Sequence, residues 1–247
     1  MTTDYDPIAE EYQRAKQHPW RIHIEAYTLD QLIPALDGQS ALDVACGEGH
    51  YTRRLRARGA AHVIGVDLSA RMIELAQAQE AKRPLGGVEY RIGDGKDLPF
   101  EGAFDLAFAA YFLNYAHDRR ELQQMCDAVA RSLKPGGRFV TVNSSPMLDF
   151  GADRSYRQYG FEAKINGGVK EGAPIIWRIF QEDGTFFDIE NYFLDKQIHE
   201  DAFRAAGFSQ VHWRAPRLSP EGEKAFGRDF WKLFLDHPTI AFIECVR

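Results

Sequence analysis

The stretch Ser40-Ala-Leu-Asp-Val-Ala-Cys-Gly-Glu-Gly49 decides the fold. Its first six residues form a short, mainly apolar run that predicts a strand, and the next four form a glycine-rich turn. The following residues, 50–58, predict a helix that ends at Gly59, with arginines in its last turn that suit the negative end of the helix dipole. Strand, glycine turn and helix in this order indicate the start of a βαβ unit.

Strands and helices continue to alternate after this unit. The apolar patterns predict further strands at 61–66, 88–92, 104–109 and 138–143, and helices at 69–82 and 118–133. The tail predicts a helix at 199–206, a strand at 209–215, a helix at 220–234 and a strand at 239–246. This alternation indicates a parallel sheet, in which ligands bind at the carboxyl ends of the strands.

Composition and charge exclude several classes of function. The 247 residues include 36 acidic and 30 basic ones, a net charge of −6 that disfavours nucleic-acid binding as the main task. The longest apolar run, 106–113, is far shorter than the ~20 residues that cross a bilayer. Three widely spaced cysteines form no zinc or redox motif and suit a reducing cytosol, and the polar start is no signal peptide. We expect a cytoplasmic protein.

The charges around the glycine turn distinguish between cofactors. A pyrophosphate at this helix N-terminus would meet Asp43 and Glu48, and Thr52 stands where the dinucleotide fingerprint needs its third glycine. S-adenosylmethionine has no phosphate and carries a sulfonium and an ammonium group, so acids favour it. The alternative is that Gly47 and Gly49 serve only a tight turn between strand and helix.

Two further acids stand at the predicted tips of the next strands. Asp67 lies about 20 residues after the glycine turn, where an acid holds a ribose diol in nucleotide-binding sheets. Asp94, between two glycines, can accept a hydrogen bond from an adenine amino group. The alternatives are a helix cap or solvated acid for Asp67 and an ordinary turn at Asp94.

Five motifs in this order resemble the class I S-adenosylmethionine-dependent methyltransferases of small-molecule type. They are Leu42-Asp-Val-Ala-Cys-Gly-Glu-Gly49, Val66-Asp-Leu-Ser-Ala-Arg-Met-Ile73, Gly93-Asp94, Phe104-Asp-Leu-Ala-Phe-Ala-Ala110 and Leu133-Lys-Pro-Gly-Gly-Arg-Phe139. The resemblance implies an α/β fold: a Rossmann-like, doubly wound sheet of seven mostly parallel strands with an antiparallel last strand.

The family pattern implies roles for individual residues at the cofactor. Ala45, Gly47 and Gly49 would shape the turn beside the methionine moiety, although glycine is commoner than alanine at the first position. The remaining residues expected there are Asp67 at the ribose, Leu68 and Met72 around the adenine, Asp94 and Gly95 at the adenine amino group, the Ala109 carbonyl near the methionine amine, and Tyr12 and Arg21 at the sulfonium and carboxylate. Tyr12 has the alternative role of a core residue.

The segments outside the alternating core are expected to cover the cofactor and the methyl acceptor. We expect a single domain, 1–247, with a helical cover at 1–36, a cofactor-binding core at 38–143, a lid insertion at 144–195 and a C-terminal completion of the sheet at 196–247. A second helix of the cover would begin at Pro19. Within the insertion, 150–173 predicts a loop, and 174–181 and 185–194 predict a hairpin around Asp183-Gly184.

Aromatic and amide side chains near the expected mouth are candidates for acceptor binding. They are Tyr111, Asn114, Tyr115, Asn143, Trp177 and Tyr192. Aromatic residues suit a flat or apolar small molecule, the alternative being that they pack the hairpin onto the sheet. Of the scattered histidines, His18, His50 and His117 fall nearest the mouth, and none is assigned as a catalytic base.

We therefore expect an enzyme that transfers a methyl group from S-adenosylmethionine to O or N of a small aromatic or heterocyclic metabolite by in-line displacement, leaving S-adenosylhomocysteine. The sulfonium already activates the carbon, so no metal is required. A C-methyltransferase, a cyclase or rearrangement enzyme on the same fold, and a cofactor-sensing module are the alternatives. The expected partner is a small-molecule acceptor, not nucleic acid or membrane, and a homodimer is left open.

Overall fold

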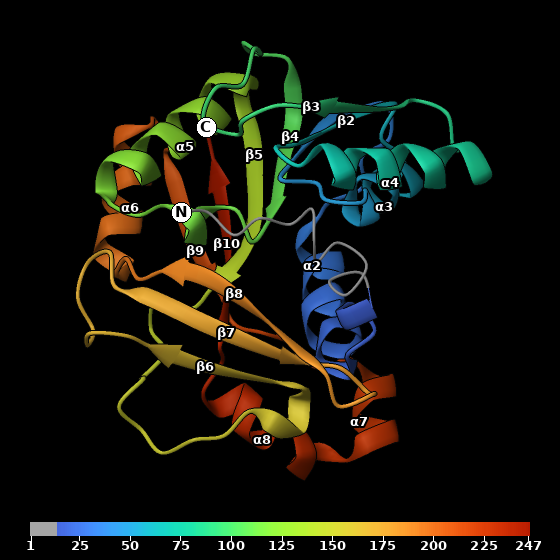
Figure 1. Cartoon of the computed structure of the whole chain (residues 1–247). Helices are drawn as coiled ribbons and strands as arrows, with labels where there is room; N and C mark the ends of the chain where they lie inside the picture. Colours follow the sequence, from blue (N-terminus) through green and yellow to red (C-terminus); the bar gives the residue numbers. More distant parts are fainter. Residues whose placement is uncertain (1–13) are drawn as a thin grey trace.

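The computed structural model describes residues 14–247, and its centre is a seven-stranded sheet with the order β3-β2-β1-β4-β5-β10-β9 (Figure 1). The strands are β1 (Ser40–Val44), β2 (His62–Asp67), β3 (Val88–Ile92), β4 (Phe104–Ala110), β5 (Leu133–Ser144), β9 (Gln210–Arg214) and β10 (Ile240–Val246). β10 runs antiparallel to both of its neighbours, and the other adjacent pairs are parallel. The expected fold class is confirmed.

The strand order reverses between β1 and β4. The chain passes from β1 outward to β2 and β3, then returns to the other side of β1 as β4. Val44 pairs with Ala109 in this register, so the segments that follow the two strands leave the sheet next to each other. A crevice at such a reversal, at the carboxyl ends of the strands, is where open α/β sheets bind ligands.

Helices cover both faces of the sheet. On one face, α5 (Arg119–Ser132) and α6 (Lys196–Ala205) share a core with β5, in which Phe203 meets Phe139 edge to face. On the other face, α2 (Tyr27–Leu32) and α3 (His50–Ala57) pack with β4, and the rings of Tyr51 and Phe108 lie 4.8 Å apart. Each fully buried large side chain contributes ~1.5–3 kcal/mol of hydrophobic stabilisation.

Side-chain caps fix where the helices begin. Ser69 accepts a hydrogen bond from the Met72 N–H and starts α4 (Ala70–Lys82), as the sequence predicts. Asp118 caps α5 by accepting bonds from the N–H groups of the first turn. These caps hold the strand tips and the helix starts in one arrangement at the carboxyl edge of the sheet.

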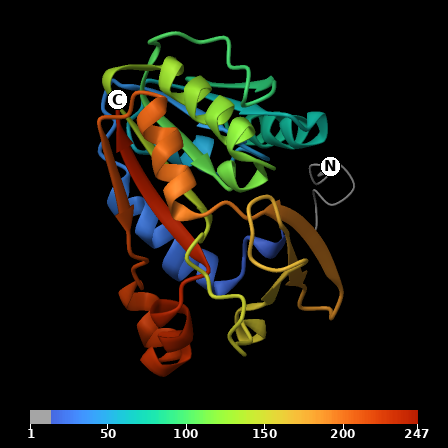
Figure 2. The same ribbon diagram turned by 90° about the vertical axis from the view of Figure 1, so that its left-hand side faces the viewer.

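The insertion forms a second, antiparallel sheet of β6 (Phe161–Ile165), β7 (Pro174–Phe180) and β8 (Phe186–Tyr192). The hairpin of β7 and β8 agrees with the prediction. The loop predicted at 150–173 is wrong at β6, because this short segment gains its ladder from β7 and has little strand signal of its own. Both views show the small sheet beyond the edge toward which β5 points (Figures 1 and 2).

The helical segments differ from the predictions in two places. The helix predicted at 220–234 is two helices, α7 (Pro220–Phe226) and α8 (Arg228–Asp236), because Gly227 breaks it with a φ of +78°. In the cover, a helical stretch begins at Pro19 as expected, but 21–26 winds as a π-helical segment, η2 (Arg21–Ala26). The short 3₁₀ turns are η3 (Leu113–Tyr115) and η4 (Arg157–Tyr159). Within residues 14–247, no helix is long and apolar enough to span a membrane.

The turn before α3 tolerates no side chain at its last glycine. Gly49 has a φ of +82°, and a Cβ there would lie 2.3 Å from the Tyr90 hydroxyl. We expect Gly49→Ala to lower the free energy of unfolding in urea by about 2–4 kcal/mol, from backbone strain and overpacking together.

Gly47→Ala is the matched control for this substitution. Gly47 has a φ of +55°, but the nearest atom to an added Cβ is the Met72 sulfur at 4.0 Å. The free energy of unfolding of Gly47→Ala should fall only by the cost of the strained backbone, about 1–2 kcal/mol. Equal losses in the two variants would show that the contact with Tyr90 does not constrain the turn.

Candidate cofactor and acceptor site

A cavity of about 400 Å³ lies where the strand order reverses. Its walls come from the glycine turn, from α3, from the residues after β4 and from the N-terminal helical segment. The residues that line it include Lys16, Arg21, Glu25, Asp43, Ala45, Gly47, His50, Tyr51, Ala110 and Tyr111. The cavity is thus formed by segments distant in sequence that meet at the carboxyl edge of the sheet.

The glycine turn is wound in the left-handed region along much of its length. Ala45 has a φ of +56°, and Gly47 and Gly49 also have positive φ angles. An alanine in this region costs about 1–2 kcal/mol, which explains why a glycine would be easier at this position. The turn brings the backbone of 45–47 directly to the cavity wall.

Buried acids surround the turn. Asp43 is 1% exposed and accepts a hydrogen bond from the Thr52 hydroxyl at 2.6 Å, and loss of hydration raises the pKa of Asp43 to about 7. Burial also raises the pKa of Glu48, but the Lys16 ammonium, 2.7 Å from that carboxylate, brings the pKa below its ordinary value overall. The negative charge beside the turn is therefore largely neutralised, by a proton on Asp43 up to about pH 7 and by the Lys16 ammonium at Glu48.

Asp67 supports the turn from the tip of β2. One carboxylate oxygen accepts the Gly47 N–H at 2.7 Å, and the other accepts the Ser69 N–H at 2.9 Å. Burial raises the pKa of Asp67, and the two backbone bonds oppose this shift. A carboxylate has about four acceptor positions, so a diol could bond to the same oxygens without displacing the backbone.

Glu25 joins three elements at one side of the cavity. Its carboxylate is buried and accepts hydrogen bonds from Arg21 Nη1 at 3.1 Å, from the Tyr51 hydroxyl at 2.8 Å and from the Tyr111 hydroxyl. Tyr111 has a φ of +61°, a strained backbone of the kind found at functional sites. Glu25 was not expected in the site, since an acid four residues after an arginine on a helix carries no sign of burial in the sequence.

A second, smaller cavity of about 40 Å³ adjoins the first. Arg21 and Tyr111 line both cavities, so the two spaces meet at these side chains. The Arg21 guanidinium lies 4.7 Å from the centre of the Trp20 ring and 5.1 Å from that of Tyr111. The other walls are Trp20, Asn114, Tyr115, Ser144, Phe161, Trp177, Ile179, Ile189, Asn191, Thr239 and Ile240.

Most of the expected acceptor residues come together at the smaller cavity. Tyr111, Asn114, Tyr115 and Trp177 line it. Trp177 faces it because alternate residues of β7 point inward. Trp20 and Thr239 belong to the same walls and were missed, because their segments show no local pattern typical of a binding site.

Two expected acceptor residues lie elsewhere. Asn143 is buried behind the wall, where its Oδ1 accepts the Leu113 N–H and its Nδ2 donates to Thr141 Oγ1, both at 2.9 Å. Tyr192 points to the opposite side of β8 and contacts His117, with the ring centres 3.9 Å apart and the planes tilted by 33°. Its neighbour Asn191 lines the cavity instead, since adjacent strand residues face opposite ways.

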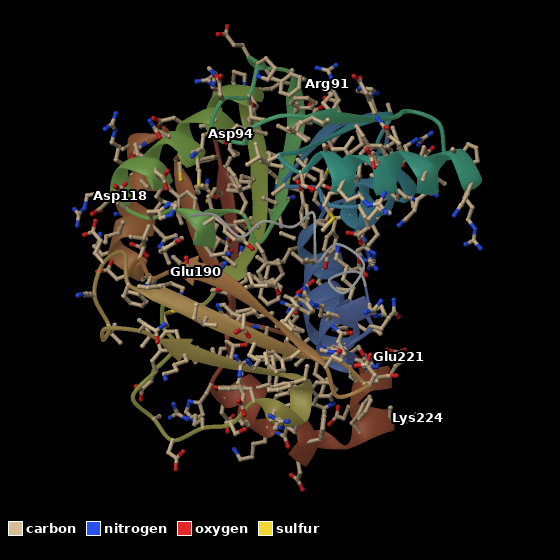
Figure 3. The ribbon with its side chains drawn as sticks, in the orientation of Figure 1. Arg91, Asp94, Asp118, Glu190, Glu221 and Lys224 are labelled. Atoms are coloured by element: carbon tan, nitrogen blue, oxygen red, sulfur yellow. The ribbon has the colours of Figure 1, made fainter. Side chains whose placement is uncertain are left out.

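The expected adenine residues surround the tips of β2 and β3. Leu68 is exposed, whereas Met72 is buried beneath the glycine turn. Asp94 stands at the loop after β3 (Figure 3), with one oxygen accepting the Lys96 N–H at 2.9 Å. The room expected at Gly95 is already occupied, because a Cβ there would lie 2.6 Å from the Phe112 ring.

Ala109, expected at the methionine amine, is fully buried in β4. The next residue, Ala110, lines the larger cavity. Tyr12 lies outside the described residues.

The three histidines singled out from the sequence lie apart. His50 lines the larger cavity, and loss of hydration, followed by the Lys16 charge, lowers the pKa of His50 to about 4, so this imidazole is neutral at pH 7. His117 bonds to Glu121 at 2.6 Å on the far side of Tyr192. His18 lies against Gly160 of the insertion.

Residues 14–247 contain no group of three or more histidine, cysteine, aspartate or glutamate side chains arranged to hold a metal ion.

Comparisons with known proteins agree with this geometry. Residues 41–137 match a family described as a methyltransferase domain. The chain is 31% identical to a demethylmenaquinone methyltransferase of Tropheryma whipplei over 197 residues, which cover 76% of this chain and 73% of that protein. It is 29% identical to the demethylmenaquinone methyltransferase of Lactococcus lactis over 218 residues, 87% of this chain and 81% of that protein.

The fold is shared with solved structures. An S-adenosylmethionine-dependent methyltransferase from Mesorhizobium loti superposes with a TM-score of 0.66 at 21% identity, covering 94% of this chain and 100% of that one. This likeness concerns the fold and extends over almost the whole chain.

The raised pKa of Asp43 makes stability depend on pH. The folded protein keeps a proton on this carboxyl up to about pH 7, whereas the unfolded chain loses it near 3.8, so the free energy of unfolding falls as the pH rises between these values. We expect Asp43 to contribute a loss of about 2–3 kcal/mol between pH 5 and pH 8.

Asp43→Asn isolates this contribution, because the amide can still accept from Thr52 but does not titrate. Urea unfolding of both proteins across this range should give curves that diverge, with the variant gaining relative stability as the pH rises. Parallel curves would mean that Asp43 is ionised throughout.

Proposed function

The chain belongs to the class I S-adenosylmethionine-dependent methyltransferases, and we propose that it methylates an oxygen or nitrogen atom of a small aromatic or heterocyclic molecule. The observation that carries the proposal is the pair of adjoining cavities, one lined by acids and the glycine turn, the other by aromatic side chains. Their junction at Arg21 and Tyr111 is where a methyl group could pass from donor to acceptor.

The residues of the larger cavity suit S-adenosylmethionine. When bound, this cofactor supplies a methyl group on a positively charged sulfur. The turn of Ala45 and Gly47 lets a chain lie close to the backbone. Asp67, which lies beside this turn and not in the cavity wall, would accept the hydroxyls of the ribose diol. A phosphate-bearing cofactor would instead bring negative charge next to the Asp67 carboxylate.

The smaller cavity suits the acceptor. Trp20, Phe161 and Trp177 offer flat apolar surfaces, and the last two come from the insertion. Methyl transfer by displacement requires the reacting atoms to be aligned and water to be excluded. Tyr111 and Arg21, both tied to Glu25, would hold this alignment at the junction.

Methyl transfer can be tested without knowing the natural acceptor. Purified protein should produce S-adenosylhomocysteine from S-adenosylmethionine with some members of a panel of phenols and nitrogen heterocycles, with the labelled methyl group appearing on the acceptor. Modification of an acceptor without transfer of label would favour a cyclase or rearrangement enzyme on this fold. Cofactor binding with no change in any acceptor would favour a sensing module.

Asp67 provides the sharpest test of the cofactor site. Asp67→Ala removes the proposed acceptor of the ribose hydroxyls, and we expect binding of S-adenosylhomocysteine to weaken by about 1–3 kcal/mol, roughly 5- to 150-fold, in calorimetry. Asp97→Ala, which removes an exposed acid from the loop after β3, should leave the affinity unchanged. Equal affinities in all three proteins would remove Asp67 from the site.

A further inference from the structure

Five buried polar atoms without a hydrogen-bond partner belong to residues that line the smaller cavity. They are Trp20 Nε1, Trp177 Nε1, Asn114 Nδ2, Asn114 Oδ1 and Thr239 Oγ1. The four residues are buried, with exposed fractions of 4% for Trp20, 8% for Trp177, 5% for Asn114 and 0% for Thr239. They come from the helical cover, from β7, from η3 and from the residue before β10, so no single local distortion explains the cluster.

Such a cluster points to a ligand. Buried polar side chains are almost always paired, because an unpaired one loses its bonds to water and gains nothing in return. Asn191, which lines the same cavity, shows the ordinary case: its Oδ1 accepts from Ser144 at 3.1 Å and its Nδ2 donates to the Glu190 carbonyl at 3.0 Å. The unpaired atoms are therefore a property of particular positions and not of the cavity as a whole.

The chemistry of these atoms defines what can pair with them. An indole N–H only donates, so Trp20 and Trp177 require acceptor atoms on the ligand. The Asn114 amide offers one acceptor and one donor side by side, and it therefore requires a donor next to an acceptor. Exchanging its oxygen and nitrogen leaves this requirement unchanged, since both ends are unpaired. Thr239 can either donate or accept.

Building on the function proposed above, we infer that the methyl acceptor is a flat heterocycle with a lactam edge, a ring carbonyl beside a ring N–H, that pairs with Asn114. Further ring carbonyl or nitrogen atoms accept from the indole groups of Trp20 and Trp177. The cavity of about 40 Å³ admits the polar edge, while the rest of the ring lies at the junction beside Tyr111. A quinone, which offers only acceptors, would leave Asn114 Oδ1 unpaired.

Two matched ligands test the inference. Quinazoline-2,4-dione has lactam edges, and its 1,3-dimethyl derivative keeps the ring and both carbonyls but has no N–H. In calorimetry with the S-adenosylhomocysteine-saturated protein, we expect the parent dione to bind at least 10-fold more tightly than the dimethyl compound. Naphthalene, a flat hydrocarbon, should bind more weakly than either.

Variants then assign the effect to particular atoms. Asn114→Leu should bring the ratio of the two dione affinities close to one, whereas Asn191→Leu, in the same cavity, should keep it. Trp177→Phe should weaken the binding of both diones by a similar factor, because both compounds carry the same carbonyl groups. The unfolding temperature of Asn114→Leu should not fall, since no protein hydrogen bond is lost, and this separates loss of recognition from loss of folding.

The outcomes separate this inference from the function on which it rests. If S-adenosylhomocysteine does not bind, the proposed function fails and the lactam site falls with it. If S-adenosylhomocysteine binds but the parent dione does not exceed its dimethyl derivative, or Asn114→Leu keeps the preference, the lactam site is wrong while the cofactor site stands. Equal binding of naphthalene and the dione would also overturn it and indicate an apolar acceptor.

Discussion

The site depends on the hydrogen bonds that the buried carboxylate of Glu25 accepts. This carboxylate accepts hydrogen bonds from Arg21 on the same helical segment, from Tyr51 on α3 and from Tyr111 after β4. A buried carboxylate needs such partners, because it loses its hydration on folding. In satisfying it, the chain fixes the helical cover on the sheet and places Arg21 and Tyr111 between the two cavities.

Much of the fold, and of the turn at its centre, follows from local sequence. The run before Gly47 predicts β1, and Ser69 begins α4 by accepting the Met72 N–H, as a capping residue should. Asp67 stands at the tip of β2 and bonds to the glycine turn. These features depend on residues close together in the chain or on strands that are direct neighbours, so the sequence alone predicts them.

The smaller cavity was harder to predict, because it depends on segments distant in sequence and on which residues of a strand face inward. β6 forms only because β7 lies beside it, and a shift of one residue in β8 exchanges Tyr192 for Asn191 at the cavity. Glu25 shows no local sign of burial, since its tyrosine partners come from other elements. Asn143 has the residue type expected of a binding group, but its two amide bonds support the η3 turn.

The central claim is that donor and acceptor meet between Arg21 and Tyr111. The most direct measurement is the crystallographic position of the sulfur atom in a complex with S-adenosylhomocysteine. The account predicts a sulfur in van der Waals contact with the side chains at this junction, facing the smaller cavity. A sulfur directed away from Tyr111, toward His50 and the outer end of the larger cavity, would contradict it.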